Sequence, residues 1–150
     1  MRRICILAMG LLLLGLLAYA QEKKPPAKTP AEFKIPQEDA ARENPVKPTP
    51  AGHENAKRIY GTDCEVCHGK EGDGKGELAA DMKVKMRDWR DAASLEKMTD
   101  GEIFYIITKG KGEMTGEEGR FKPEQYWQVV NYVRSFAKKD SAVKKPDKSQ

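Results

Sequence analysis

The stretch that decides the fold is Cys64-Glu65-Val66-Cys67-His68. It contains two of the three cysteines in the 150-residue chain, and the third, Cys5, lies in an apolar N-terminal segment. A zinc ribbon would need a second cysteine pair to complete its four ligands, and the sequence has no such pair. A thioredoxin-like dithiol would follow a strand of a βαβ unit, whereas the residues before Cys64 have a helical pattern.

A third chemistry that uses this spacing is covalent attachment of haem. Two thiols separated by two residues on a helical turn match the spacing of the two vinyl groups, and His68 then faces the iron. Haem would also supply apolar surface to a chain in which only 39% of residues are hydrophobic. We expect a poorly folded apo chain and a haem buried among Tyr60, Leu78, Trp89, Ile103, Ile106, Tyr132 and Val133. A disulfide between Cys64 and Cys67 is the alternative.

The sixth position on the iron needs a further ligand, and a methionine thioether is one that haem proteins use. Four methionines follow the N-terminal apolar segment: Met82, Met86, Met98 and Met114. Met114 lies in the polar, glycine-rich stretch GKGEMTG at 110–116, where no packing pattern explains an apolar side chain. We therefore expect Met114 to be the distal ligand, with Met86 as the next choice. Met98 precedes a helix-capping pattern, and Met82 and Met86 lie on a short turn or helix, so packing explains all three.

Two alternatives for the sixth position stay open. His53 as a ligand would give a bis-histidine haem of lower potential, although this residue lies close to a proline-rich segment. An empty sixth position would expose the iron to small ligands and to peroxide chemistry.

Composition divides the chain into four parts. Residues 1–20 are expected to be a signal peptide, because Arg2 and Arg3 precede an apolar run that ends at the small-residue cleavage pattern Ala18-Tyr19-Ala20. Residues 21–52 hold seven of the nine prolines and predict an extended linker. Residues 53–137 form the predicted folded domain. Residues 138–150 are rich in lysine and predict a disordered tail.

The predicted domain reads as helices joined by glycine-rich loops, with no convincing strand pattern. We expect helices at 54–62, 103–108 and 123–137, and a loop at 69–76. The pattern Thr99-Asp100-Gly101-Glu102 predicts a capping box before the second of these helices, and Gly110 predicts its end. Residues 53–137 carry 14 basic and 16 acidic side chains, so no basic face for nucleic acid is expected.

Several motifs in order resemble the class I c-type cytochromes, in the form of small single-haem bacterial proteins. They lie between residues 54 and 136 and are Ala56-x-x-x-Tyr60, the pentapeptide with Gly69, the loop GDGKG at 72–76, Gly110-Lys111-Gly112-x-Met114 and VNYVR at 130–134. The resemblance implies an all-α, cytochrome c-like fold of three to four helices around one haem. It also implies His68 as the proximal ligand and Met114 as the distal ligand. Thr115 and the Glu77-Leu78-Ala79 segment stand where the family often has proline.

The expected function is that of a single-haem, periplasmic one-electron carrier between redox proteins, and not that of an enzyme. A haem enzyme or sensor with an open or displaceable sixth position is the alternative. The site residues are expected to be Cys64 and Cys67 for covalent attachment, with His68 and Met114 as iron ligands. If the leader is not cleaved, residues 4–20 would tether the protein to a membrane.

Overall fold

The computed structural model describes residues 33–143, with side chains up to residue 137. The predicted signal peptide, the linker as far as residue 32 and the end of the predicted tail lie outside the described residues. The elements of the described part are α2 (Gln37–Ala40), α3 (Pro50–Asp63), α4 (Glu65–His68), α5 (Glu77–Asp81), α6 (Ala93–Glu96), α7 (Asp100–Lys109), β1 (Gly110–Lys111), β2 (Met114–Thr115) and α8 (Pro123–Val143).

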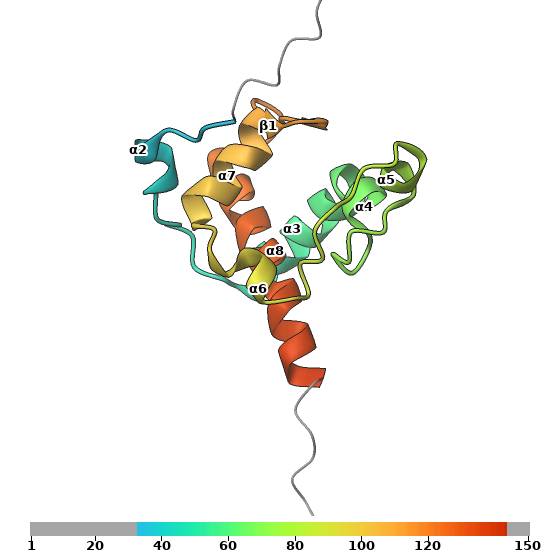
Figure 1. Cartoon of the computed structure of the whole chain (residues 1–150). Coiled ribbons are helices and arrows are strands. Elements are labelled where there is room, and N and C mark those ends of the chain that lie inside the picture. The colour runs from blue at the N-terminus through green and yellow to red at the C-terminus, as the bar shows by residue number, and fades with distance from the viewer. Residues whose placement is uncertain (1–32, 144–150) are drawn as a thin grey trace, which may run out of the picture. The chain divides into compact units, whose positions relative to one another are not determined.

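The all-α prediction is confirmed: helices make up the core of the fold, and α3 and α7 both pack against α8 (Figure 1). The apolar stripe of α8 is buried as the sequence predicts, because its members recur at three- and four-residue steps and face one side. These residues are Tyr126, Val129, Val130, Val133 and Phe136. The core is completed by residues of α3, α7 and α8 and by Leu95: Ala56, Ile59, Tyr60, Ile103, Phe104, Ile107, Trp127 and Tyr132.

Local capping signals set the ends of α7. The hydroxyl of Thr99 accepts the backbone N–H of Glu102 at 3.0 Å, and the Glu102 carboxylate accepts the backbone N–H of Thr99 at 2.8 Å, so the predicted capping box is confirmed. Gly110 ends the helix with a φ of 81°, a conformation that favours glycine.

The segment from residue 33 to residue 49, which the sequence assigns to an extended linker, packs on the folded unit. Asn44 donates to the carbonyl of Trp127 at 3.2 Å and to the side chain of Asn131 at 3.0 Å, and Arg42 stacks on the ring of Phe104. A Cβ on Gly101 would lie 2.1 Å from the carbonyl oxygen of Asp39, so α2 and α7 meet closely. These long-range contacts order a proline-containing segment that has no strong local preference.

Helices α3 and α8 are longer than expected. Helix α3 starts at Pro50 rather than Glu54, because Thr49 caps it and proline is tolerated at the first helical position. Helix α8 continues to Val143, since residues 138–143 contain neither proline nor glycine. None of the helices in the described residues is long and apolar enough to cross a membrane.

A short hairpin follows α7. Strands β1 and β2 pair antiparallel, with Gly110 opposite Thr115 and Lys111 opposite Met114. The hairpin differs from the predicted absence of strands, because two residues per strand are too few to show the alternation that identifies a strand.

Candidate functional site

The two cysteines lie on a single helical turn at the end of α3. The backbone N–H of His68 donates to the carbonyl of Cys64 at 2.9 Å, and the N–H of Cys67 donates to the same carbonyl at 3.2 Å. Both cysteines are half-buried free thiols in this structure. The turn therefore presents two sulfurs and an imidazole from consecutive positions of one short helix.

The glycine-rich loop closes over the carboxyl end of this turn. The N–H groups of Gly74 and Gly76 donate to the carbonyls of His68 at 2.9 Å and Cys67 at 3.2 Å. A Cβ on Gly76 would lie 2.4 Å from backbone atoms of Val66 and Cys67, so only glycine allows the loop to approach this closely. The loop and α4 thus form one hydrogen-bonded unit.

The loop is also fixed to the helical core behind it. The buried hydroxyl of Tyr60 donates to the carbonyl of Gly69 at 2.6 Å, and the backbone N–H of Trp89 donates to the carbonyl of Gly72 at 2.8 Å. A Cβ on Gly72 would lie 2.7 Å from the ring of Phe136 on α8. Helices α3 and α8 therefore hold the cysteine-containing turn in place.

His68 is buried and stacks on Trp89, with ring centroids 4.1 Å apart and the rings inclined by 20°. Burial lowers the pKa of His68 to about 4, so the ring is neutral at physiological pH. Its Nδ1 atom is buried without a hydrogen-bond partner, an arrangement that costs free energy. A neutral imidazole is suited to metal coordination.

The residues around the turn fit a haem. Leu78 is 41% exposed on α5 and Val66 is 47% exposed on α4, so apolar side chains beside the thiols lack a cover. The residues expected to line the haem differ in their exposure. Four are buried (Tyr60, Ile103, Tyr132 and Val133), Trp89 and Ile106 are half-buried, and Leu78 is exposed. Two free thiols, an imidazole and uncovered apolar surface are together what covalent haem needs.

Met114 lies on β2 and is half-buried. The hairpin is held at its base, where the N–H groups of Glu117 and Glu118 donate to the carbonyls of Ile107 at 2.9 Å and Thr108 at 3.0 Å. In Figure 1 the hairpin and α4 both project to the same side of α8 and are separated from each other. The contacts found among the described residues do not join Met114 to the cysteine-containing turn.

The other methionines have different surroundings. The sulfur of Met98 accepts a hydrogen bond from Arg87 at 3.2 Å, and its side chain packs on the core, as expected of a packing residue. Met82 is 46% exposed rather than packed. Met86 is half-buried, and its Cβ would lie 3.0 Å from a Cβ on Gly74. Met98 is thus occupied by other partners.

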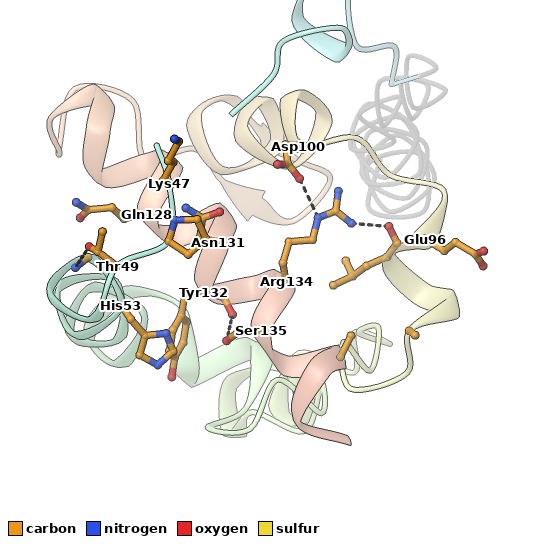
Figure 2. Close-up of a pocket in the computed structure, with 15 residues that line it drawn as sticks. Lys47, Thr49, His53, Glu96, Asp100, Gln128, Asn131, Tyr132, Arg134 and Ser135 are labelled. Atoms are coloured by element: carbon orange, nitrogen blue, oxygen red, sulfur yellow. Dashed lines mark hydrogen bonds and ion pairs between the residues drawn. The ribbon is translucent and has the colours of Figure 1, made fainter. Parts of the chain in front are cut away.

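A pocket of about 670 Å³ lies elsewhere, between the start of α3, α6 and α8 (Figure 2). His53, the alternative iron ligand, lines it with its ring 4.9 Å from that of Tyr132. None of the four predicted site residues lines this pocket. Among the described residues, no group of three or more His, Cys, Asp or Glu side chains could hold a metal ion by itself.

Comparison with known proteins identifies the family. A model of the family described as "Cytochrome C oxidase, cbb3-type, subunit III" matches residues 51–133, more than half of the chain. The chain belongs to this family of c-type cytochromes. This cytochrome therefore carries covalently bound haem c with iron, as the pentapeptide predicts.

The solved structures that match include the KustC0563 c-type cytochrome. It is 28% identical, with a TM-score of 0.48, over 54% of this chain and 95% of that one. A search of curated proteins found no match. The segment at 33–50, which packs on α7 and α8, lies outside the residues that the family model matches.

Sequence reasoning missed one group of charged residues near the site. Arg120, in the segment after the hairpin, forms ion pairs with Asp63 and Glu117. Asp63 directly precedes Cys64, yet its partner lies 57 residues further along the chain, so no local pattern could reveal the pair.

Proposed function

We propose that this cytochrome is an exported one-electron carrier, with haem attached to Cys64 and Cys67 and ligated by His68 and Met114. The observation that carries the proposal is the helical turn at 64–68, which combines two free thiols with a buried imidazole. Membership of a c-type cytochrome family supports a haem electron carrier in general. The filled sixth position is what makes the protein a carrier rather than an enzyme.

When bound, haem c supplies an iron that cycles between the ferrous and ferric states. The chain's own residues hold that iron and limit access to it. The turn and the glycine loop keep His68 fixed and shielded from water. Met114 would supply a soft thioether, which favours ferrous iron and would keep small ligands from binding it. With the iron held by both His68 and Met114, electron transfer would require little rearrangement of the protein.

Residues 1–20 have the pattern of a secretory leader, which supports an extracytoplasmic location such as the periplasm. The partners of such a carrier would be one redox protein that donates the electron and another that accepts it. If the leader is not cleaved, residues 4–20 would instead tether the protein to the membrane.

The proposal is tested on the purified, haem-containing protein by absorption spectroscopy. The ferric protein is expected to show the near-infrared sulfur-to-iron charge-transfer band, and the ferrous protein is expected not to bind carbon monoxide. Met114→Ala should abolish the band and allow stoichiometric binding of carbon monoxide. Met98→Leu is the matched control, because the sulfur of Met98 already accepts a hydrogen bond from Arg87.

Two results would contradict the ligand assignment. Binding of carbon monoxide by the native ferrous protein would favour the alternative, a haem enzyme or sensor with an open or displaceable sixth position. Loss of the band in Met86→Ala, with the band retained in Met114→Ala, would assign the distal position to Met86.

A further inference from the structure

A guanidinium group links the segment after the hairpin to the residue that precedes the first haem-attachment cysteine. One terminal nitrogen of Arg120 contacts a carboxylate oxygen of Asp63 at 2.6 Å, and the other terminal nitrogen contacts Glu117. Asp63 is the last residue of α3 and directly precedes Cys64. Arg120 therefore links the segment at 117–120 to the end of α3.

The two carboxylates are shielded from water, and Arg120 is the cation that binds both. The side chain of Asp63 is 9% exposed and that of Glu117 is 16% exposed, whereas that of Arg120 is 54% exposed. The hydrogen bonds to Glu117 and Asp63 raise the pKa of Arg120 above its usual value, so it stays charged. Without this cation, two poorly hydrated negative charges would lie next to each other.

The backbone holds this cluster in place. The N–H of Glu117 donates to the carbonyl of Ile107 at 2.9 Å, and the Tyr126 hydroxyl donates to the carbonyl of Glu117 at 2.5 Å. The Glu117 carboxylate cannot easily move away from Asp63, because both of its neighbouring backbone groups are bonded to helices α7 and α8.

The cluster acts electrostatically at the first cysteine. Burial is the main cause that raises the pKa of Cys64, to about 12; Asp63 and Glu117 raise it further, whereas Arg120 lowers it. Asp63 directly precedes Cys64, so the ion-paired cluster lies next to the residue that the proposed function assigns to haem attachment.

We propose that Arg120 is a positioning residue that raises the reduction potential of the haem by balancing Asp63 and Glu117. This inference rests on the proposed attachment of haem at Cys64. The ferric iron carries one more positive charge than the ferrous iron, so uncompensated carboxylates near the haem favour the ferric state. Arg120 reduces the charge of the cluster from −2 to −1 and shifts the balance toward the ferrous state.

The test is a redox titration of the haem-containing Arg120→Gln protein against a mediator, in which one electron reduces each ferric iron and no bond forms or breaks. At a fixed ambient potential the ratio of ferrous to ferric protein should fall about 2.5-fold to 16-fold, as expected for a unit charge about 10–15 Å away at an effective dielectric constant of about 20–40. Arg120→Lys should keep most of the native ratio. Asp63→Asn/Arg120→Gln restores the cluster charge to −1 and should return the ratio toward the native value.

The matched control is Lys109→Gln, which breaks an exposed ion pair with Glu118 in the same region but has no link to Asp63. It should lower the ratio much less than Arg120→Gln does, because solvent screens the exposed Lys109–Glu118 pair more strongly. If Arg120→Gln does not fold, Asp63→Asn alone gives the test in the opposite direction, because it removes a negative charge and should raise the ratio.

Each outcome supports or overturns the inference. The inference is overturned if Arg120→Gln keeps the native ratio of ferrous to ferric protein, or if Asp63→Asn does not raise that ratio. It is also overturned if Lys109→Gln lowers the ratio as much as Arg120→Gln does. Mass analysis of the native protein separates the two proposals: a chain without haem on the peptide that contains Cys64 and Cys67 overturns both. With haem present, an unchanged ratio overturns only the role of Arg120.

Discussion

The cysteine-containing turn and the Met114 hairpin are held in different ways. Hydrogen bonds from Tyr60, Gly74 and Gly76 enclose the turn at 64–68, and it rests on buried aromatic rings. The hairpin is held at its base, and Lys111, Gly112 and Glu113 at its tip are exposed. The turn proposed to carry the haem is therefore held by more contacts than the hairpin that carries Met114.

The largest expected effect comes from removing the attachment side altogether. Cys64→Ser/Cys67→Ser should lose essentially all covalent haem and most of the cooperative unfolding transition, because haem supplies part of the core. Haem staining after denaturing electrophoresis and thermal unfolding measure the two effects. A well-folded variant that unfolds as cooperatively as the native protein would show that the side chains alone make a sufficient core.

A pair of glycine substitutions compares the two regions directly. In Gly72→Ala the new Cβ meets the ring of Phe136 at 2.7 Å on a backbone with φ of 70°; we expect the free energy of unfolding to fall by about 2–4 kcal/mol. In Gly112→Ala the φ is 60° but no atom lies within 4 Å, so a loss of about 1 kcal/mol is expected. Denaturant unfolding of the haem-containing variants checks both. Equal losses would show that the turn is no more tightly packed than the hairpin.

The smallest expected effect concerns Phe33, which lies outside the family match and contacts the hairpin. Its ring meets that of Tyr105 at 6.2 Å, and the ammonium group of Lys111 lies 5.1 Å from its centre. Phe33→Ala should weaken the hairpin by about 0.5–1 kcal/mol and speed imidazole binding at the sixth position about twofold to fivefold. Stopped-flow absorption measures this rate.

Lys111→Ala, which keeps the contact between Phe33 and Tyr105, should give a smaller acceleration of imidazole binding. If imidazole binds to Phe33→Ala at the native rate, the segment at 33–49 does not influence access to the sixth position.

Features with a local cause could be predicted from the sequence. The capping box of Thr99 and Glu102, the stripe on α8 and the turn at 64–68 each depend on residues a few positions apart. The identity of the distal ligand stays a prediction, because it depends on where the glycine-rich β1–β2 hairpin lies relative to the haem.

Features that depend on distant partners could not be predicted. Asn44 is bonded to Trp127, 83 residues away, and Arg120 to Asp63, 57 residues away. The prolines of the upstream segment suggested an unpacked linker, yet long-range hydrogen bonds and the stacking of Arg42 on Phe104 order residues 33–49. Pro50 lies in the predicted linker, yet it suits the first turn of α3.

The most direct test of the central claim is mass spectrometry of the peptide that contains residues 64–68, taken from protein made in a host that attaches haem to exported chains. We predict that this peptide carries the mass of one haem, held through thioethers to both Cys64 and Cys67. A peptide with two free thiols, or with a disulfide between them, would contradict the account.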